Sequence, residues 1–443
     1  MPRKKSGVSL PGLSITLAIT LVATALMPVR NAHAGTLKTL YSFCSQANCA
    51  DGEIPVGTLA HDAKGRLFGT AVFGGDTNGD GTVFALIPAK DGSWEFRSLY
   101  QFCIDCSLPG QQPSAVIIDT AGNLYGTTFS GGSNGGGMAF ELSPADKDKW
   151  SLKSLFSFPV SGLPGAEPVD SPTYVGASDG APYDGKSPLF GVTAYGGANS
   201  CYTGAGGCGA IYELTPENGT WSLSNIYSFL GGRDGYYPLS LTSDAAGNLY
   251  GATWWGGTFN AGAAFRLAHD GDVWTETILK SFGTLDGSFP SGKLLPVSMG
   301  SIFGTTAAGG RYCYYRKHQY HRCGGEVFKL VPSGLANHSF TPHVFCDTDD
   351  NCLDGAGPGA GVIRDRTGNI YGTASAGGEN GRGVIFRIST ERKYDVLYHF
   401  CSLANCADGA NPGGLFLNKE GKLYGVTAYG GAHGGGTVFE LSP

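Results

Sequence analysis

The sequence predicts an all-β fold, a seven-bladed β-propeller with kelch-like, four-stranded blades. One phrase recurs every 50 to 70 residues or so, which is the spacing of propeller blades. No segment after residue 34 shows the 3.6-residue periodicity of amphipathic helices, and glycine supplies 72 of the 443 residues, which disfavours helices. The phrase is an apolar residue, an aromatic residue, Gly and a small or β-branched pair, then two residues and Gly-Gly, and its copies begin at Leu67, Leu124, Leu189, Leu249, Ile302, Ile370 and Leu423.

Each copy is expected to hold four strands, which in the second copy begin at Ser114, Asn123, Gly137 and Trp150. The strand that carries the phrase does not alternate between apolar and polar residues, as expected for a sheet covered on both faces by neighbouring blades. We expect the glycine of the phrase where inner strands converge on the axis, because a side chain there would push the sheets apart. A parallel β-helix is the alternative, but its rungs are usually much shorter than this repeat.

Residues 1–34 are predicted to be a signal peptide. Three basic residues near the amino terminus precede an apolar run from Leu13 to Met27, and Ala32-His33-Ala34 offers an A-x-A cleavage site. The run is shorter than the ~20 residues that a membrane-spanning helix needs. Cleavage changes the formal charge from −6 to −10. We therefore expect a secreted or periplasmic protein that has no membrane span after cleavage and does not bind nucleic acid.

Residues 35–443 are predicted to form one propeller domain, because the repeats run on without a linker. Residues 37–43 read as a fourth strand and residues 437–441 as a third strand, so the two ends together complete one blade. Pairing between them would close the ring and leave no unpaired edge at the seam. We expect a monomer.

The twelve cysteines fall into six sequence-local pairs. In an exported chain this pattern favours disulfides. Zinc binding, and a redox role for Cys103-Ile-Asp-Cys106, are weaker alternatives because the pairs lie in different repeats and Cys103 follows a strand. The pairs are Cys44 with Cys49, Cys103 with Cys106, Cys201 with Cys208, Cys313 with Cys323, Cys346 with Cys352, and Cys401 with Cys406.

The pairs also predict a working face. Four lie between a fourth strand and the next first strand, and two lie in Gly-Gly loops between second and third strands. In an antiparallel blade these two kinds of loop emerge on the same side. We call this side the disulfide-bearing face, and loop-borne function is expected there.

The combination of LYGTT, Gly-Gly and GTVFEL resembles the GloVer (Gloeo/Verruco) tandem-repeat family, exported bacterial proteins of the choice-of-anchor type. The resemblance covers residues 36–443. It implies a propeller, and it brings no established activity and no catalytic residues that could be carried over.

The longest insertion lies in the fifth Gly-Gly loop and is cationic and aromatic on an otherwise acidic protein. Its Arg and Lys residues can pair with uronate or sulfate groups while tyrosine rings stack on sugars. A polysaccharide lyase would need the same types, a Tyr or His base for the C5 proton and a cation at the carboxylate. A solvated loop with no partner is the alternative. The candidate ligand-binding residues are Arg311, Tyr312, Tyr314, Tyr315, Arg316, Lys317, His318, Tyr320, His321 and Arg322.

Trp254 and Trp255 precede the fourth Gly-Gly and are predicted to lie beside that insertion. Two consecutive side chains at a strand end place at least one outward, whereas plain blade packing is the alternative. A third candidate is a calcium site at Asp76, Asn78 and Asp80, spaced like the start of a calcium-binding loop. Its twelfth position is Ile87 rather than Glu, so an ordinary Asx-rich turn is favoured over the calcium site. Calcium is the only cofactor that the sequence suggests.

Two classes of function follow. The first is an exported binding or interaction module whose partner is an acidic extracellular polysaccharide or another exported protein. The second is a carbohydrate-active enzyme such as a polysaccharide lyase. The sequence contains no nucleophile elbow, no H-E-x-x-H and no phosphate loop, and no catalytic residue is predicted. No repeat other than the fifth is chemically elaborated, so the binding module is favoured.

Overall fold

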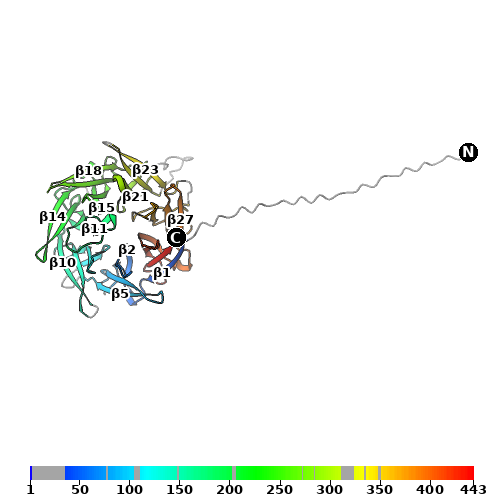
Figure 1. Cartoon of the computed structure of the whole chain (residues 1–443), viewed down its shortest axis with the longest axis horizontal. Coiled ribbons are helices and arrows are strands. Elements are labelled where there is room, and N and C mark those ends of the chain that lie inside the picture. The colour runs from blue at the N-terminus through cyan, green and yellow to red at the C-terminus, as the bar shows by residue number, and fades with distance from the viewer. Residues whose placement is uncertain are drawn as a thin grey trace. The chain divides into compact units, whose positions relative to one another are not determined.

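The computed structural model describes residue 1 and residues 35–443, apart from 76–77, 104–109, 147–148, 202–205, 272, 284, 311–323, 334–335 and 348–350. Within the compact unit His33–Pro443, antiparallel strands form seven sheets arranged in a ring (Figure 1). The helical segments of the described residues are short 3-10 turns. The predicted all-β, seven-bladed propeller is confirmed.

Each blade is one sheet, built from a first, a second, a third and a fourth strand in that order. Blade 1 is β2 (Glu53–His61), β3 (Leu67–Phe73), β4 (Thr82–Pro88) and β5 (Trp94–Gln101); blade 2 is β6 (Gly110–Pro113) with β7 (Ile117–Ile118), β8 (Leu124–Gly131), β9 (Gly135–Pro144) and β10 (Trp150–Pro159); blade 3 is β11 (Ala166–Thr173), β12 (Leu189–Tyr195), β13 (Ala210–Glu217) and β14 (Thr220–Ser228).

Blade 4 is β15 (Tyr236–Ser243), β16 (Leu249–Trp255), β17 (Ala263–Asp270) and β18 (Val273–Ser281); blade 5 is β19 (Ser288–Pro290) with β20 (Leu295–Pro296), β21 (Ile302–Ala308), β22 (Glu326–Ser333) and β23 (Ala336–Val344); blade 6 is β24 (Val362–Arg364), β25 (Ile370–Ala374), β26 (Val384–Ile388) and β27 (Tyr394–His399); blade 7 is β28 (Ala410–Leu417), β29 (Leu423–Tyr429), β30 (Thr437–Ser442) and β1 (Thr36–Ser42). The 3-10 turns are η1 (Ala47–Cys49), η3 (Ala177–Asp179), η4 (Gly232–Asp234), η5 (Ser298–Gly300) and η6 (Ala404–Cys406).

The two ends of the chain close the ring as predicted. Strand β1 pairs antiparallel with β30, in a register that sets Leu37 opposite Leu441 and Ser42 opposite Thr437. The residue after β1, Phe43, is fully buried, and its ring lies 5.0 Å from that of Phe84 in blade 1. The seam therefore combines a strand ladder with aromatic packing onto the next blade.

The glycine of the repeat phrase has a different role from the one expected. In each blade it lies opposite an aromatic residue of the third strand, and a Cβ on Gly126, for example, would lie 2.6 Å from Phe140 Cζ. The glycine makes room for that ring. The first strands, such as β2, β11 and β15, lie nearest the centre of the ring, and the fourth strands, such as β5, β10 and β14, lie outside (Figure 1). The glycine–aromatic pairs are Gly69–Phe84, Gly126–Phe140, Gly191–Tyr212, Gly251–Phe265, Gly304–Phe328, Gly372–Phe386 and Gly425–Phe439.

The hydrophobic core lies between adjacent sheets. One cluster joins Phe68 and Val83 of blade 1 to Leu124 and Phe140 of blade 2, all at most 3% exposed. Similar clusters fill the other interfaces between blades. The second strands are covered on both sides, which explains why they do not alternate between apolar and polar residues.

The same turn, Gly-x-x-Pro, lies at or just before the start of every first strand, at the disulfide-bearing face. The residue before the proline has a left-handed backbone in all seven blades, and its N–H commonly donates to the preceding blade, as from Asn411 to Arg382 O at 2.9 Å. These turns hold the residue before each proline at the inner end of the blade. The seven residues are Ile54, Gln112, Glu167, Tyr237, Phe289, Gly357 and Asn411.

Candidate functional site

Disulfides tie the loops of one face. Among the described residues, Cys44–Cys49, Cys201–Cys208, Cys346–Cys352 and Cys401–Cys406 are bonded as predicted. Cys103 is also disulfide-bonded, whereas Cys106, Cys313 and Cys323 lie outside the described residues.

The two kinds of loop lie together on this face. Backbone N–H groups of the Gly-Gly loops donate to the loop that leads into the first strand of the same blade, from Gly378 to Cys352 O at 2.8 Å and from Gly431 to Cys406 O at 2.8 Å. Such bonds make the disulfide-bearing face a rigid platform for side chains.

Aromatic side chains gather at the inner ends of blades 3, 4 and 5 on this face. Tyr195 and Tyr237 meet edge to face with ring centroids 5.2 Å apart. Across the next junction, Trp254 stacks on Phe289 at 5.3 Å, and Trp255 meets the same ring edge to face at 4.8 Å. All five side chains are partly exposed. We call this group the aromatic crescent.

A carboxyl group stands at the blade 3 end of the crescent. Glu167 precedes Pro168 in the inner turn, and partial burial raises its pKa above the ordinary value. Burial also raises the pKa of Tyr237, with contributions from Tyr195 and from the charge of Glu167. Glu167 holds the same position before the proline of blade 3 that Tyr237 holds in blade 4, both with a left-handed backbone. In the described part of the chain no ion pair of Glu167 is found, so the group is available to accept hydrogen bonds.

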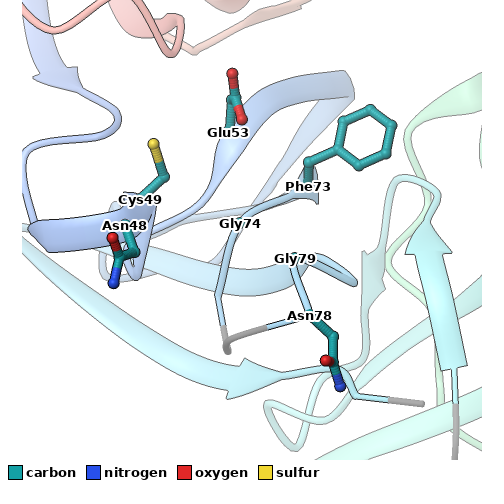
Figure 2. A pocket seen from close by; sticks show the side chains of 7 residues that line it. All are labelled: Asn48, Cys49, Glu53, Phe73, Gly74, Asn78 and Gly79. Carbon is teal, nitrogen blue, oxygen red and sulfur yellow. The ribbon is translucent and has the colours of Figure 1, made fainter.

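A second feature of the same face is a hollow of about 540 Å³ in blade 1. Figure 2 shows Asn48 and Cys49 on one side, Phe73 on the opposite side and Glu53 between them. The remaining lining residues are Gly74, Asn78 and Gly79. The hollow thus combines an aromatic ring with amides and a carboxylate.

In the part of the chain that the structure describes, a pair of opposite charges joins two inner segments of the ring. Lys293 of blade 5 reaches past blade 4 to blade 3, where its Nζ lies 3.2 Å from Asp170 Oδ2 and 2.7 Å from Ser171 Oγ. Asp170 Oδ2 has no further hydrogen-bond partner. The pair links two non-adjacent blades, and we interpret it as structural.

The predicted tryptophan site is only partly described. Trp254 and Trp255 contact Phe289, so they do lie beside the first strand of blade 5. The ten predicted ligand-binding residues between Arg311 and Arg322 lie outside the described residues. Their proximity to the tryptophans therefore remains a prediction.

The predicted calcium site is also incomplete, because Asp76 lies outside the described residues. Asn78 lines the hollow of blade 1, whereas Asp80 is 8% exposed and accepts a hydrogen bond from Gln111 Nε2 of blade 2 at 3.0 Å. Asp80 therefore has an interblade role whether or not it binds calcium. Among the described residues, Cys44, Cys49 and Glu53 form a further cluster with metal-like ligands. Its two sulfur atoms form a disulfide, which leaves no thiolate to bind a metal.

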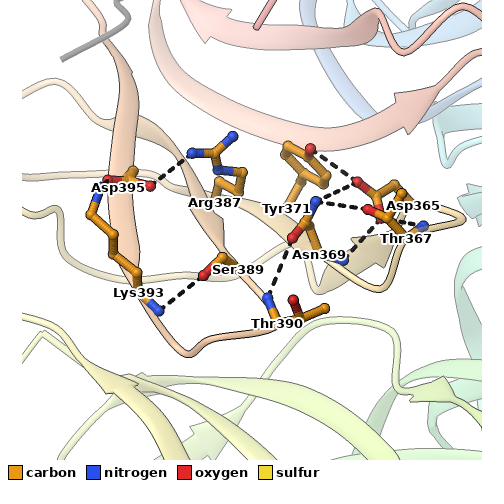
Figure 3. A network of polar contacts seen from close by, with 9 residues as sticks. All are labelled: Asp365, Thr367, Asn369, Tyr371, Arg387, Ser389, Thr390, Lys393 and Asp395. Atoms are coloured by element: carbon orange, nitrogen blue, oxygen red, sulfur yellow. Dashed lines mark hydrogen bonds and ion pairs between the residues drawn. The ribbon is translucent and has the colours of Figure 1, made fainter.

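Several conspicuous carboxylates have structural partners. On the opposite face, Asp365 accepts hydrogen bonds from the N–H groups of Thr367 and Asn369 and from the Tyr371 hydroxyl, which fixes a hairpin (Figure 3). On the disulfide-bearing face, Asp408 accepts from the Tyr398 hydroxyl and two loop N–H groups. Asp354 accepts hydrogen bonds from His343 Nε2 and from the N–H of Cys346. These groups hold loops.

Sequence reasoning missed Glu167, Tyr237 and Phe289. The signal was present, because each precedes the proline of a Gly-x-x-Pro turn that recurs in every blade while its own side chain varies. A position that varies inside an invariant turn is where a repeat protein can place ligand-specific side chains.

No helix in the described part of the chain is long and apolar enough to cross a membrane. No curated protein matches the sequence. Among solved structures, the extracellular domain of a one-component system from B. thetaiotaomicron matches at 10% identity with a TM-score of 0.53, over 92% of this chain and 40% of that one. A fungal alcohol oxidase of the AA5 family, in complex with copper, matches at 12% identity with a TM-score of 0.53, over 93% of this chain and 77% of that one.

Identities this low show the fold alone. The sequence itself is more informative. The model of the Gloeobacter/Verrucomicrobia repeat matches residues 30–203 and 313–443, which is most of the chain. The protein, with its phrase repeated around a closed ring of seven blades, belongs to the Gloeobacter/Verrucomicrobia repeat family.

Proposed function

We propose that this protein is an exported saccharide-binding propeller, and that it holds an acidic extracellular polysaccharide against the aromatic crescent. Residues 1–34 act as its signal peptide, and residues 35–443 are the working domain. The observation that carries the proposal is the crescent itself, five partly exposed aromatic side chains that span two blade junctions on the disulfide-bearing face.

Aromatic rings suit this task because they offer large, rigid, apolar faces to the C–H faces of sugars at little entropic cost. The inner turns and the disulfides fix the backbone that carries the crescent. Little conformational entropy of the protein is therefore lost when a ligand binds.

Charge would orient the ligand along the crescent. Glu167 at the blade 3 end is suited to accept hydrogen bonds from hydroxyl groups. Arg311, Arg316, Lys317 and Arg322 belong by sequence to the Gly-Gly loop of blade 5, at the other end. We therefore expect uronate or sulfate groups to lie towards blade 5.

The test is calorimetric titration of the purified protein with hexagalacturonate at low and at moderate salt. We expect Trp254→Ala and Trp255→Ala each to weaken binding about tenfold, the effect of losing one stacked ring. Deletion of residues 314–322 should remove the salt dependence. Phe340→Ala is the matched control, because Phe340 is 47% exposed on β23, the fourth strand of blade 5, whereas the crescent residues lie on first and second strands.

If the parent binds no acidic glycan, or if both tryptophan variants bind as the parent does, the proposal is wrong. The same samples are followed by absorbance for unsaturated products. Their appearance would replace the binding function with lyase chemistry at this face.

A further inference from the structure

The hollow of blade 1 lies apart from the crescent, and its main wall is an exposed ring. Phe73 ends β3 and is 38% exposed, although the strand before it is buried. It pairs across the sheet with Glu53, the first residue of β2, so both side chains project from the same side of blade 1. Both line the hollow (Figure 2).

The opposite wall is a preformed turn. Asn48 has a left-handed backbone with φ of 56° inside η1, which the Cys44–Cys49 disulfide closes. The fully buried carboxylate of Asp51 fixes this turn by accepting hydrogen bonds from the Tyr41 hydroxyl at 2.7 Å and from the N–H of Ser45 at 2.9 Å. Asn48 is exposed.

Two polar side chains of the hollow are not engaged within the protein. Neither the Asn48 amide nor the Glu53 carboxylate has a hydrogen-bond or ion-pair partner among the described residues. An amide offers two donors and an acceptor, and a carboxylate accepts from hydroxyl groups. Together with one stacking ring they match a sugar that presents hydroxyls at its edge and C–H groups on its face.

The neighbouring blade repeats the arrangement. In blade 7 the turn η6 carries Asn405, also at φ of 56°, inside the Cys401–Cys406 disulfide. Tyr429 stands where Phe73 stands in blade 1 and is 50% exposed, and it pairs with Ala410 in place of Glu53. Blades 7 and 1 are adjacent, so the two aromatic positions lie next to one another around the ring.

We propose that blades 7 and 1 form a second saccharide site, which takes neutral, hydroxyl-rich sugar units of a glycan chain. Phe73 and Tyr429 stack on successive parts of the chain, while Asn48, Asn405 and Glu53 bind its hydroxyls. The Glu53 carboxylate disfavours uronates by charge repulsion, so this site selects a different ligand from the crescent. The proposal shares the disulfide-bearing face with the proposed function and does not depend on the crescent.

The experiment titrates the full protein with neutral hexasaccharides, namely cellohexaose, maltohexaose and xylohexaose, with hexagalacturonate in parallel. We expect at least one neutral hexasaccharide to bind to the parent protein. Phe73→Ala should weaken that binding about tenfold, and the double variant Phe73→Ala with Tyr429→Ala should weaken it further. Asn48→Gly should also weaken it, because glycine keeps the left-handed backbone and removes only the amide. Phe340→Ala serves as the control and should bind as the parent does.

Two results would overturn the proposal. One is a parent protein that binds none of the three neutral hexasaccharides. The other is binding of a neutral hexasaccharide that is as strong in Phe73→Ala and in Asn48→Gly as in the parent. If Trp255→Ala weakens that binding instead, the neutral sugars bind at the crescent. A parent protein that binds a neutral hexasaccharide but not hexagalacturonate would contradict the proposed function and support this second site. Thermal melting of each variant confirms that it is folded.

Discussion

Pro55 of blade 1 packs against Gly436 of blade 7 at the seam of the ring, where a Cβ on Gly436 would lie 2.6 Å from Pro55 Cδ. The glycine also has a left-handed backbone, with φ of 97°. An equivalent glycine, at or just before the start of the third strand, faces the proline of the next blade at every other junction. The other pairs are Gly81–Pro113, Gly137–Pro168, Gly209–Pro238, Gly262–Pro290, Gly325–Pro358 and Gly383–Pro412.

The seam should therefore be sensitive to a single methyl group. We expect Gly436→Ala to lower the free energy of unfolding by about 2 to 4 kcal/mol, because the backbone is strained and the new Cβ would overlap both Thr427 O and Pro55. Gly421→Ala is the control in the same blade, because Gly421 has φ of 85° but no atom within 4 Å of its Cβ position. Gly421→Ala should lower the free energy of unfolding by about 1 to 2 kcal/mol. Equal losses of unfolding free energy in urea denaturation would show that the overlaps around Gly436 contribute nothing.

The seven-bladed architecture could be predicted because all copies of the repeat indicate the same blade structure. The phrase that begins at Leu124 is one of seven copies, and the terminal segments around Leu37 and Leu441 read as parts of one blade. The role of the repeat glycine could not be predicted, because the ring that it accommodates, such as Phe140 for Gly126, belongs to another strand. The spacing of residues along one strand does not show which residue of the neighbouring strand pairs with each of them.

The candidate site was predicted less well for a similar reason. Trp254 and Trp255 stand out as large consecutive side chains, whereas Tyr237 and Phe289 look like ordinary strand residues. Their inner position follows from the turn before each proline, whose left-handed backbone appears only in three dimensions. The hollow at Phe73 likewise depends on a cross-strand pair with Glu53.

The Lys293–Asp170 pair should stabilise the ring from within. Lys293→Met would leave Asp170, whose side chain is 18% exposed, without a cation, and we expect a loss of about 1 to 3 kcal/mol in unfolding free energy. Lys293→Met with Asp170→Asn should lose less than the sum of the single changes. Lys393→Met is the control, because Lys393 is 70% exposed in its pair with Asp395 and should cost under about 1 kcal/mol. Additive single losses would contradict the coupling.

Peptide mapping under non-reducing conditions should recover six local disulfides. Four are present among the described residues, and Cys103–Cys106 and Cys313–Cys323 are expected to complete the set. Short loops favour these partners because little chain entropy is lost on closure. A peptide that links Cys44 to Cys406 would show instead that the two similar loops of blades 7 and 1 are cross-linked.

Calcium binding at Asp76, Asn78 and Asp80 should raise the melting temperature in excess calcium relative to chelator. Asp80→Ala should abolish that difference, but it also removes the hydrogen bond from Gln111. Gln111→Ala is therefore the matched control, since it loses the bond and keeps the carboxylate. If calcium leaves the parent's melting temperature unchanged, the segment is only a turn.

Glu326 should make stability depend on pH near neutrality. It opens β22 with a fully buried side chain, and its Oε1 has no hydrogen-bond partner while Oε2 accepts from Thr341 Oγ1 at 3.2 Å. Burial raises its pKa from 4.5 to about 7, and nearby Lys280 only partly opposes this because it pairs with Asp286 at 2.7 Å.

A carboxyl whose pKa is higher in the folded state holds its proton there while the unfolded chain has released it. Its stabilising contribution is present below pH 4.5 and is lost as the pH rises through about 7, by up to about 3 kcal/mol. We therefore expect Glu326→Gln to match the parent at pH 5 and to exceed its unfolding free energy at pH 8, as measured in urea. Some slope should remain in the variant, because burial and Asp234 also raise the pKa of Glu276 to about 7. Glu95→Gln, at a side chain that is 57% exposed, is the control and should change neither value. A Glu326→Gln effect of equal size at both pH values would show that the carboxyl keeps its charge state across this range.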